Sequence, residues 1–567
     1  MSKVKNYKSK PPLHNSKIKL EQTKRKKEPE VKSSFLDILN NRFTKHYRFL
    51  FYFILSVSLF FSLLLFNLRI SEGGDDSNYI YVAYRYSKEF LSYYYFAQPP
   101  FYPILLSVFI RFAGINLFLL KSLSIIFNFS AVYFLLKGFY KKIPSLIFFP
   151  VVFLTTINSH FLYYASQTYT EAIFVLFQAL LIYFIAKLPE EEKKLEDVLA
   201  NWKLWLAIGS IIFLMDFTRR IGIVVLPSLI IYLLFNKRFY GVAAVISAFS
   251  VFKIPFEVVK NIIWPDNSTS ETASFFMKNP YHPHEGTEDF AGIVTRLFKN
   301  ADLYLSKRFF QIIGFKSELS TEVSTLLTIL VTGLFLLGLY FAIKNKNQLL
   351  IFSGIYTCVM VITTFLAIQI IWDQPRLIHI YLPLMLFIIL YGIYELVKKS
   401  SFPIQSLFLY LLIAMFATTI IQTFDKAKDN FPGLIKNLKG DKFYGYTPDW
   451  VNFLKMSEWC GKNLSKEFIV GSRKPSMSFI YSGGREFYPL YRVLSTDADT
   501  VLTLFKEAGV SHVILASLRR NPKVADGTMI NTIHRMLNPV ATKYPGKLQL
   551  IHQEGTWEPA YLYKINY

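Results

Sequence analysis

Cysteine is scarce in this sequence of 567 residues, which contains only Cys358 and Cys460. Cys358 lies within an apolar run and Cys460 lies in the polar C-terminal part, so the two cannot form a structural disulfide framework. The sequence also has no glycine-rich loop followed by Lys-Ser or Lys-Thr, and no His-Glu-x-x-His. Nothing therefore points to ATP-driven transport.

A cleavable signal peptide is not expected either, because residues 1–48 are polar and lack an apolar core. They hold fourteen Lys or Arg against four acids and so supply +10 of the formal net charge of +24. With so few apolar residues they are predicted to form a disordered tail. Beside a membrane span, such a tail indicates cytoplasmic retention and attraction to anionic lipid, and no nucleic-acid partner is expected.

Apolar residues, by contrast, make up 52% of the chain, with 55 Phe and 36 Tyr. Apolar runs of about 20 residues, the length that crosses hydrocarbon, recur many times. They predict an α-helical polytopic membrane protein. The runs lie near residues 50–69, 115–136, 144–162, 171–187, 203–218, 221–236, 239–262, 324–343, 348–371, 377–397 and 403–423.

Basic residues in the short loops predict the orientation. With the tail, the loops containing Lys137–Lys142, Lys187–Lys194, Lys237–Arg238, Lys344–Lys346 and Lys398–Lys399 are expected in the cytoplasm. They share one side only if the short run 101–112 does not cross, so that run is interpreted as an interfacial or re-entrant helix. About eleven transmembrane helices then result, in a plasma-membrane protein with a cytoplasmic N-terminus.

This topology divides the chain into three parts. The tail, residues 1–48, precedes a transmembrane catalytic domain, residues 49–423, with external loops at 70–103 and 264–323. Residues 424–567 form an extracytoplasmic domain. Its short β-rich runs, with helix-like stretches such as Asp497–Ala508 between them, predict an α/β fold. The β-rich runs are Phe468–Val470, His512–Leu515, Leu548–Ile551 and Tyr561–Tyr563.

The first external loop carries two adjacent carboxylates, Asp75 and Asp76, followed by a cluster of aromatic residues within 90–96. Aromatic side chains favour the membrane–water interface, so the carboxylates are expected beside lipid headgroups. Two acids in a polar loop are more often simply solvated. Other charges favour a site, because they lie on the same side against the positive-inside trend. They are Glu171, Arg219, Arg220 and Arg376.

Arginine presents a planar fork of donors that suits phosphate oxygens. Carboxylates and arginines together at an outer interface therefore predict a site for a phosphorylated lipid. The alternative is a set of snorkelling arginines and internal ion pairs.

A second cluster, His282-Pro283-His284-Glu285, lies in the loop 264–323. Two histidines separated by one residue can both bind a metal if the backbone is extended. A third firm ligand is missing, so a surface loop is the more common interpretation. A divalent metal remains open as the one possible cofactor.

At this point the residues resemble a known family. Asp75-Asp76-x-x-Tyr79-x-x-x-Ala83 followed by Pro100-Phe101-Tyr102-Pro103 is similar to the first external loop of polyprenyl-phosphate-dependent glycosyltransferases of the GT-C fold. Protein O-mannosyltransferases and aminoarabinose lipid A transferases belong to this group. The resemblance covers roughly residues 50–400. Further matches are Thr170-Glu171 opening a span, Thr218-Arg219 followed by Gly222, and Arg376 followed by Pro383.

The resemblance implies an inverting transfer of a sugar from a polyprenyl-phosphate carrier to an external acceptor, which is a glycan, a lipid or a protein. Asp75 matches the catalytic acid position, and Asp76 matches a Glu in many relatives. Gln98 stands where many lipid A transferase relatives have Lys, which argues against that substrate. The predicted catalytic residues are Asp75 and Asp76, with Asp75 as the general base. The predicted donor-phosphate residues are Arg219, Arg220 and Arg376, and the predicted substrate-binding residues are Tyr79, Gln98, Tyr102 and Glu171.

Two other functions fit the same spans and charges. A flippase or transporter of lipid-linked saccharides would place its acidic motif midway through the spans, whereas Asp75 and Asp76 lie in an external loop. A non-catalytic assembly protein would use the external domain to bind a partner.

Overall fold

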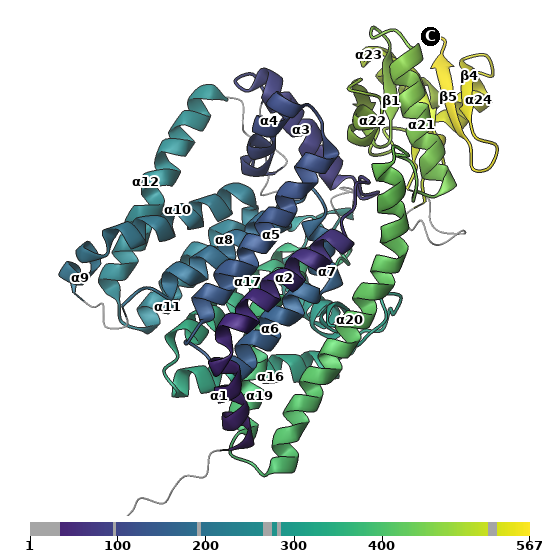
Figure 1. The fold of residues 1–567 in the computed structure, drawn as a ribbon. Coiled ribbons are helices and arrows are strands. Elements are labelled where there is room, and N and C mark those ends of the chain that lie inside the picture. The colour runs from purple at the N-terminus through teal and green to yellow at the C-terminus, as the bar shows by residue number, and fades with distance from the viewer. Residues whose placement is uncertain (1–33, 94–97, 190–193, 265–274, 280–284, 520–529) are drawn as a thin grey trace, which may run out of the picture.

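In the part of the chain that the structure describes, the named elements up to residue 438 are helices, and all the named strands follow that residue. The computed structural model describes residues 34–93, 98–189, 194–264, 275–279, 285–519 and 530–567. Figure 1 shows a helical domain and a smaller C-terminal domain with a β-sheet, joined by the long helix α20.

The helical domain contains most of the predicted spans. Its first helices are α1 (Phe35–Lys45), α2 (Tyr47–Leu64), α3 (Asp75–Glu89), α4 (Phe101–Ala113), α5 (Leu117–Phe139), α6 (Ser145–Ile157), α7 (Ser159–Ala165), α8 (Thr170–Ile185), α9 (Leu195–Ala200) and α10 (Trp202–Thr218). They continue with η1 (Arg220–Val224), α11 (Val225–Phe235), α12 (Phe239–Ile263), α14 (Phe290–Ala301), η3 (Asp302–Arg308), α15 (Phe309–Ile312), α16 (Thr325–Lys344), α17 (Gln348–Ala367), α18 (Arg376–His379), α19 (Leu382–Val397) and α20 (Phe402–Leu438).

Six described helices are long and apolar enough to cross a membrane: α2, α5, α12, α16, α17 and α20. A seventh span results if α6 and α7, which meet at a bend of 56°, are counted as one. Four shorter apolar segments, Phe101–Ala113, Thr170–Ile185, Arg220–Phe235 and Leu382–Val397, lie between them. The prediction of an α-helical, multi-pass membrane protein is therefore confirmed.

The predicted short helix at 101–112 is α4, which packs along α3. With 13 residues it is about 20 Å long, shorter than the roughly 30 Å of hydrocarbon in a bilayer. Together α3 and α4 cover one end of the helical domain (Figure 1).

The structure differs from the sequence prediction at the end of the tail, where α1 forms. Ser34 and Asp37 make a capping box: the Ser34 side chain accepts from the Asp37 amide, and the Asp37 carboxylate accepts from the Ser34 amide. Leu36 is fully buried, and its amide donates to Gln405 Oε1 at 3.1 Å. The tail composition is polar on average, but this last segment is amphipathic and packs against α6 and α20.

The C-terminal domain is a five-stranded sheet with helices on both faces, which confirms the predicted α/β pattern. The strand order is β2-β1-β3-β5-β4, parallel from β2 to β3 and antiparallel beyond. The strands are β1 (Ile469–Ser472), β2 (Phe487–Pro489), β3 (Val510–Leu515), β4 (Leu548–Glu554) and β5 (Ala560–Ile565), and the helices are α21 (Pro448–Asn463), α22 (Pro475–Tyr481), α23 (Ala498–Glu507) and α24 (Ile533–Lys543).

Neighbouring residues of β3 point to opposite faces of this sheet, as in any strand. Val513 joins the core beneath α23 and α24, whereas Ile514 joins the core that includes Trp450 of α21.

The connection between the two domains is helical. The transmembrane part was expected to end at residue 423, but α20 continues without a break to Leu438. The boundary between the domains therefore follows the end of this helix.

Candidate functional site

A cavity of about 790 Å³ lies in the helical domain beside the N-terminal end of α3. Its walls come from α3, the starts of α8 and α18, the junction of α10 with η1, and the end of α17. Segments far apart in the sequence thus meet around one space. Seven of the residues predicted from the sequence line it: Asp75, Tyr79, Gln98, Glu171, Arg219, Arg220 and Arg376.

Asp75 is the first residue of α3, and its position depends on the glycine before it. Gly74 has a φ of 88°, in the left-handed region that favours glycine. This backbone turn starts the helix at Asp75. The Asp75 carboxylate lies 2.5 Å from Nη1 of Arg376, and its side chain is 36% exposed.

Arg376 begins α18, directly after Pro375. The segment before it is fixed by η3, because Lys307 and Arg308 both donate to the carboxylate of Asp373, at 2.7 and 2.5 Å. Arg308 also donates to the Asp373 carbonyl at 2.7 Å. The helix η3, which lies in the segment 264–323 expected to be an external loop, therefore holds the chain just before Arg376. The sequence of that segment did not indicate this role.

Arg219 forms the second ion pair of the cavity, with Nη1 2.9 Å from the carboxylate of Glu171. Arg219 follows the end of α10 in an extended conformation, and η1 turns immediately after it. The turn requires Gly222, because a Cβ there would lie 2.1 Å from the carbonyl oxygen of Met215. The Thr218-Arg219 and Gly222 pattern in the sequence thus corresponds to a close backbone approach.

Among the described residues that line the cavity, the charged side chains are two carboxylates, those of Asp75 and Glu171, and three guanidinium groups, those of Arg219, Arg220 and Arg376. Much of the remaining wall is apolar and includes Ile221, Val224, Phe275, Ile368, Leu377 and Ile380. Such a cavity suits an anionic group attached to an apolar chain, with a carboxylate available as a base.

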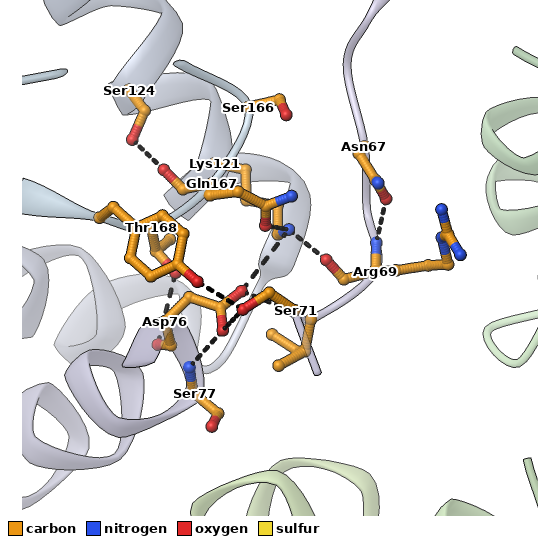
Figure 2. Close-up of polar contacts among 12 residues, drawn as sticks. Asn67, Arg69, Ser71, Asp76, Ser77, Lys121, Ser124, Ser166, Gln167 and Thr168 are labelled. Atoms are coloured by element: carbon orange, nitrogen blue, oxygen red, sulfur yellow. Dashed lines mark hydrogen bonds and ion pairs between the residues drawn. The ribbon is translucent and has the colours of Figure 1, made fainter. Parts of the chain in front are cut away.

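Asp76 does not line this cavity. It is fully buried, and its carboxylate accepts hydrogen bonds from the amide and hydroxyl of Ser71 and from the amide of Ser77, each at 2.9 Å (Figure 2). Lys121 of α5, also fully buried, lies 4.0 Å away. Burial raises the pKa of Asp76, while Lys121 and these hydrogen bonds oppose the rise. Asp76 therefore holds the loop that precedes α3, and of the two predicted catalytic acids it is Asp75 that lines the cavity.

Lys121 is not among the residues predicted from the sequence, although a lysine within an apolar run is a signal in itself. Its ammonium donates to Gln167 Oε1 at 2.5 Å and to the carbonyl of Arg69 (Figure 2). It therefore ties α5 to the segment before α3 and to the segment before α8.

Tyr79 lines the cavity and Tyr102 does not, just as Asp75 lines it and Asp76 does not. Tyr79 lines the cavity and donates to Gln98 Oε1. Tyr102 is fully buried behind it: the two rings meet edge to face at 5.6 Å, and the Tyr102 hydroxyl lies 3.3 Å from Ser124 Oγ. Tyr102 thus supports Tyr79 and does not reach the cavity.

The predicted metal ligands do not form a site in the described part of the chain. His282 and His284 lie outside the described residues, and Glu285 accepts a hydrogen bond from Asn279 at 3.4 Å. Among the described residues, no three His, Cys, Asp or Glu side chains are grouped so that they could hold a metal ion.

Comparison with known proteins gives matches in structure. No family model and no curated protein sequence matches the chain. ArnT from Cupriavidus metallidurans bound to undecaprenyl phosphate is 10% identical with a TM-score of 0.54, over 90% of this chain and 97% of ArnT. The Archaeoglobus fulgidus oligosaccharyltransferase in complex with zinc and sulfate is 10% identical with a TM-score of 0.50, over 82% of this chain and 68% of that one.

The chain therefore has the GT-C fold of these transferases, as the resemblance in its motifs predicted. At this level of identity the likeness is one of fold.

Proposed function

We propose that this protein is an inverting glycosyltransferase that moves a sugar from a polyprenyl-phosphate carrier to an acceptor on the external side of the membrane. The observation that carries the proposal is the cavity in which Asp75 lies beside Arg219, Arg220 and Arg376. The GT-C fold supports it, as does the undecaprenyl phosphate bound to ArnT.

In this mechanism the arginines hold the carrier phosphate. Negative charge grows on the phosphate as its bond to the sugar breaks, and guanidinium donors already in place stabilise that charge. The apolar wall of the cavity receives the first part of the polyprenyl chain. Arg376 is paired with Asp75 before the donor binds. When the phosphate takes up some of its donors, the Asp75 carboxylate is released from this ion pair.

Asp75 then acts as the general base. The acceptor hydroxyl oxygen attacks the anomeric carbon, its proton passes to the Asp75 carboxylate, and the bonding electrons of the sugar–phosphate bond leave with the phosphate. A single displacement inverts the anomeric centre, and no covalent intermediate forms on the protein.

We propose the topology expected from the sequence, with eleven crossings, residues 1–48 inside and the C-terminal domain outside. Lys141, Lys142, Arg238 and Lys346, from three basic loops, line one cavity of about 250 Å³, which supports a common cytoplasmic face for these loops. Helix α22 of the C-terminal domain packs against α3. This contact supports a position of the C-terminal domain on the same side of the membrane as Asp75.

Transfer of a labelled sugar from a synthetic polyprenyl-phosphate donor by the purified protein tests the proposal. A transporter or an assembly protein would leave the donor intact. Absence of transfer with every donor sugar and acceptor class supplied would reject the enzyme.

A further inference from the structure

We propose that Lys474 of the C-terminal domain is a positioning residue of the candidate active site, acting through the backbone that precedes Asp75. The inference rests on the proposed function and adds to it a role for the C-terminal domain. Lys474 is the residue before α22, and it is about 400 positions from the loop that it contacts.

The contact is made with the turn that starts α3. Lys474 Nζ donates to the carbonyl oxygen of Gly73 at 2.9 Å. It also covers Gly74, where a Cβ would lie 3.2 Å from Nζ. Gly74 is the left-handed residue whose conformation sets the first residue of α3. The lysine therefore braces the two residues that aim Asp75.

Further contacts along α3 keep the two domains in register. Ser476 Oγ and Ser77 Oγ lie 2.9 Å apart, and the Tyr81 hydroxyl donates to Glu486 at 2.7 Å. The C-terminal domain thus holds α3 at Ser77 and Tyr81, while Lys474 holds the backbone just before Asp75. The loop before α3 is held as well, because the Tyr446 hydroxyl donates to the Ile70 carbonyl at 2.6 Å.

The charges around Lys474 favour this contact. Glu72 from the loop and Asp75 and Asp76 from α3 attract its ammonium, whereas its neighbour Arg473 repels it. Burial lowers the pKa of Lys474 to about 8. Lys474 does not line the cavity, so it acts on Asp75 through position and not through contact with substrate.

The test compares Lys474→Met, Lys474→Arg and the control Lys462→Met in the purified full-length protein. Lys462 lies in the same domain, and its side chain is 69% exposed. Lys474→Met should lower kcat about 10–100-fold with little change in KM for the donor, because a displaced base costs rate more than binding. Lys474→Arg should recover most of the rate. In the wild type kcat should fall above about pH 8, where Lys474 loses its proton. In Lys474→Arg that fall should occur at a higher pH, because arginine stays charged there.

Hydrogen exchange of residues 70–78 is the second measurement and needs no activity. Lys474→Met should speed exchange there, whereas Lys462→Met should leave it unchanged. An inactive wild type would reject the proposed function, and hydrogen exchange would still decide the contact. An active wild type, with Lys474→Met equal to Lys462→Met in rate and exchange, would overturn the inference. If Lys474→Met does not fold, Lys474→Gln is compared with Lys462→Gln in the same two measurements.

Discussion

The adjacent acids Asp75 and Asp76 should respond to the same substitution in opposite ways. Asp75→Asn removes the proposed base from the cavity and should abolish most turnover while the protein stays folded. Asp76→Asn removes a buried carboxylate that holds the loop and should destabilise the protein. The contrast follows from burial: Asp75 is 36% exposed, whereas Asp76 is fully buried.

The magnitudes follow from the contacts. Loss of a general base costs about 10²–10⁴-fold in rate, or about 2.7–5.5 kcal/mol of activation free energy. The Asp75–Arg376 pair is partly exposed and contributes about 1 kcal/mol or less to stability. Asp76→Asn leaves Lys121 buried without its carboxylate, and breaking a buried pair costs about 3–5 kcal/mol.

Purified variants in the same detergent would be compared by thermal unfolding and by initial rates at saturating donor. Asp75→Asn should keep a melting temperature close to that of the wild type and lose its rate. Asp76→Asn should melt at a clearly lower temperature. Near wild-type turnover by Asp75→Asn would refute the assignment of the base, and an unchanged melting temperature for Asp76→Asn would refute the structural role.

Three further outcomes are expected. Arg219→Lys and Arg376→Lys should each raise KM for the donor about 10-fold, because lysine keeps the charge but loses the fork of donors; unchanged kinetics would contradict phosphate binding. Lys121→Met should lower the melting temperature, because it leaves Asp76 without its buried partner; equal melting curves would contradict this. In a background without native cysteines, an impermeant thiol reagent should label Thr496→Cys in intact cells and Ser401→Cys only after permeabilisation; the reverse pattern would invert the topology.

Much of the fold could be predicted because each span must satisfy its own backbone hydrogen bonds within the bilayer. Length and apolarity therefore locate the helices without knowledge of their neighbours. The break between α6 and α7 could not be predicted in this way. It depends on Asn158, whose side chain accepts from two amides of α7 and donates to the distant carbonyl of Ile312.

The site was predictable where a charge lies against a general trend. Arg219 and Arg376 were singled out because arginine is unusual at span ends that are expected to lie outside. Asp75 and Asp76 could not be told apart, since one step along a helix turns a side chain by about 100° and only the packed neighbours decide which one is buried. Lys474 carries no local signal, because the loop that it contacts lies 401 residues earlier in the chain.

The length of α20 sets how far the C-terminal domain stands from the apolar part of that helix. Its 37 residues span about 55 Å, whereas hydrocarbon accounts for about 30 Å, so the helix is roughly 25 Å longer than the hydrocarbon requires. Because the helix is continuous, any tilt of its apolar part is passed on to the C-terminal domain. Under the proposed function, a thinner membrane that tilts α20 would also shift the lysine that contacts the turn before Asp75, so that the rate would depend on bilayer thickness.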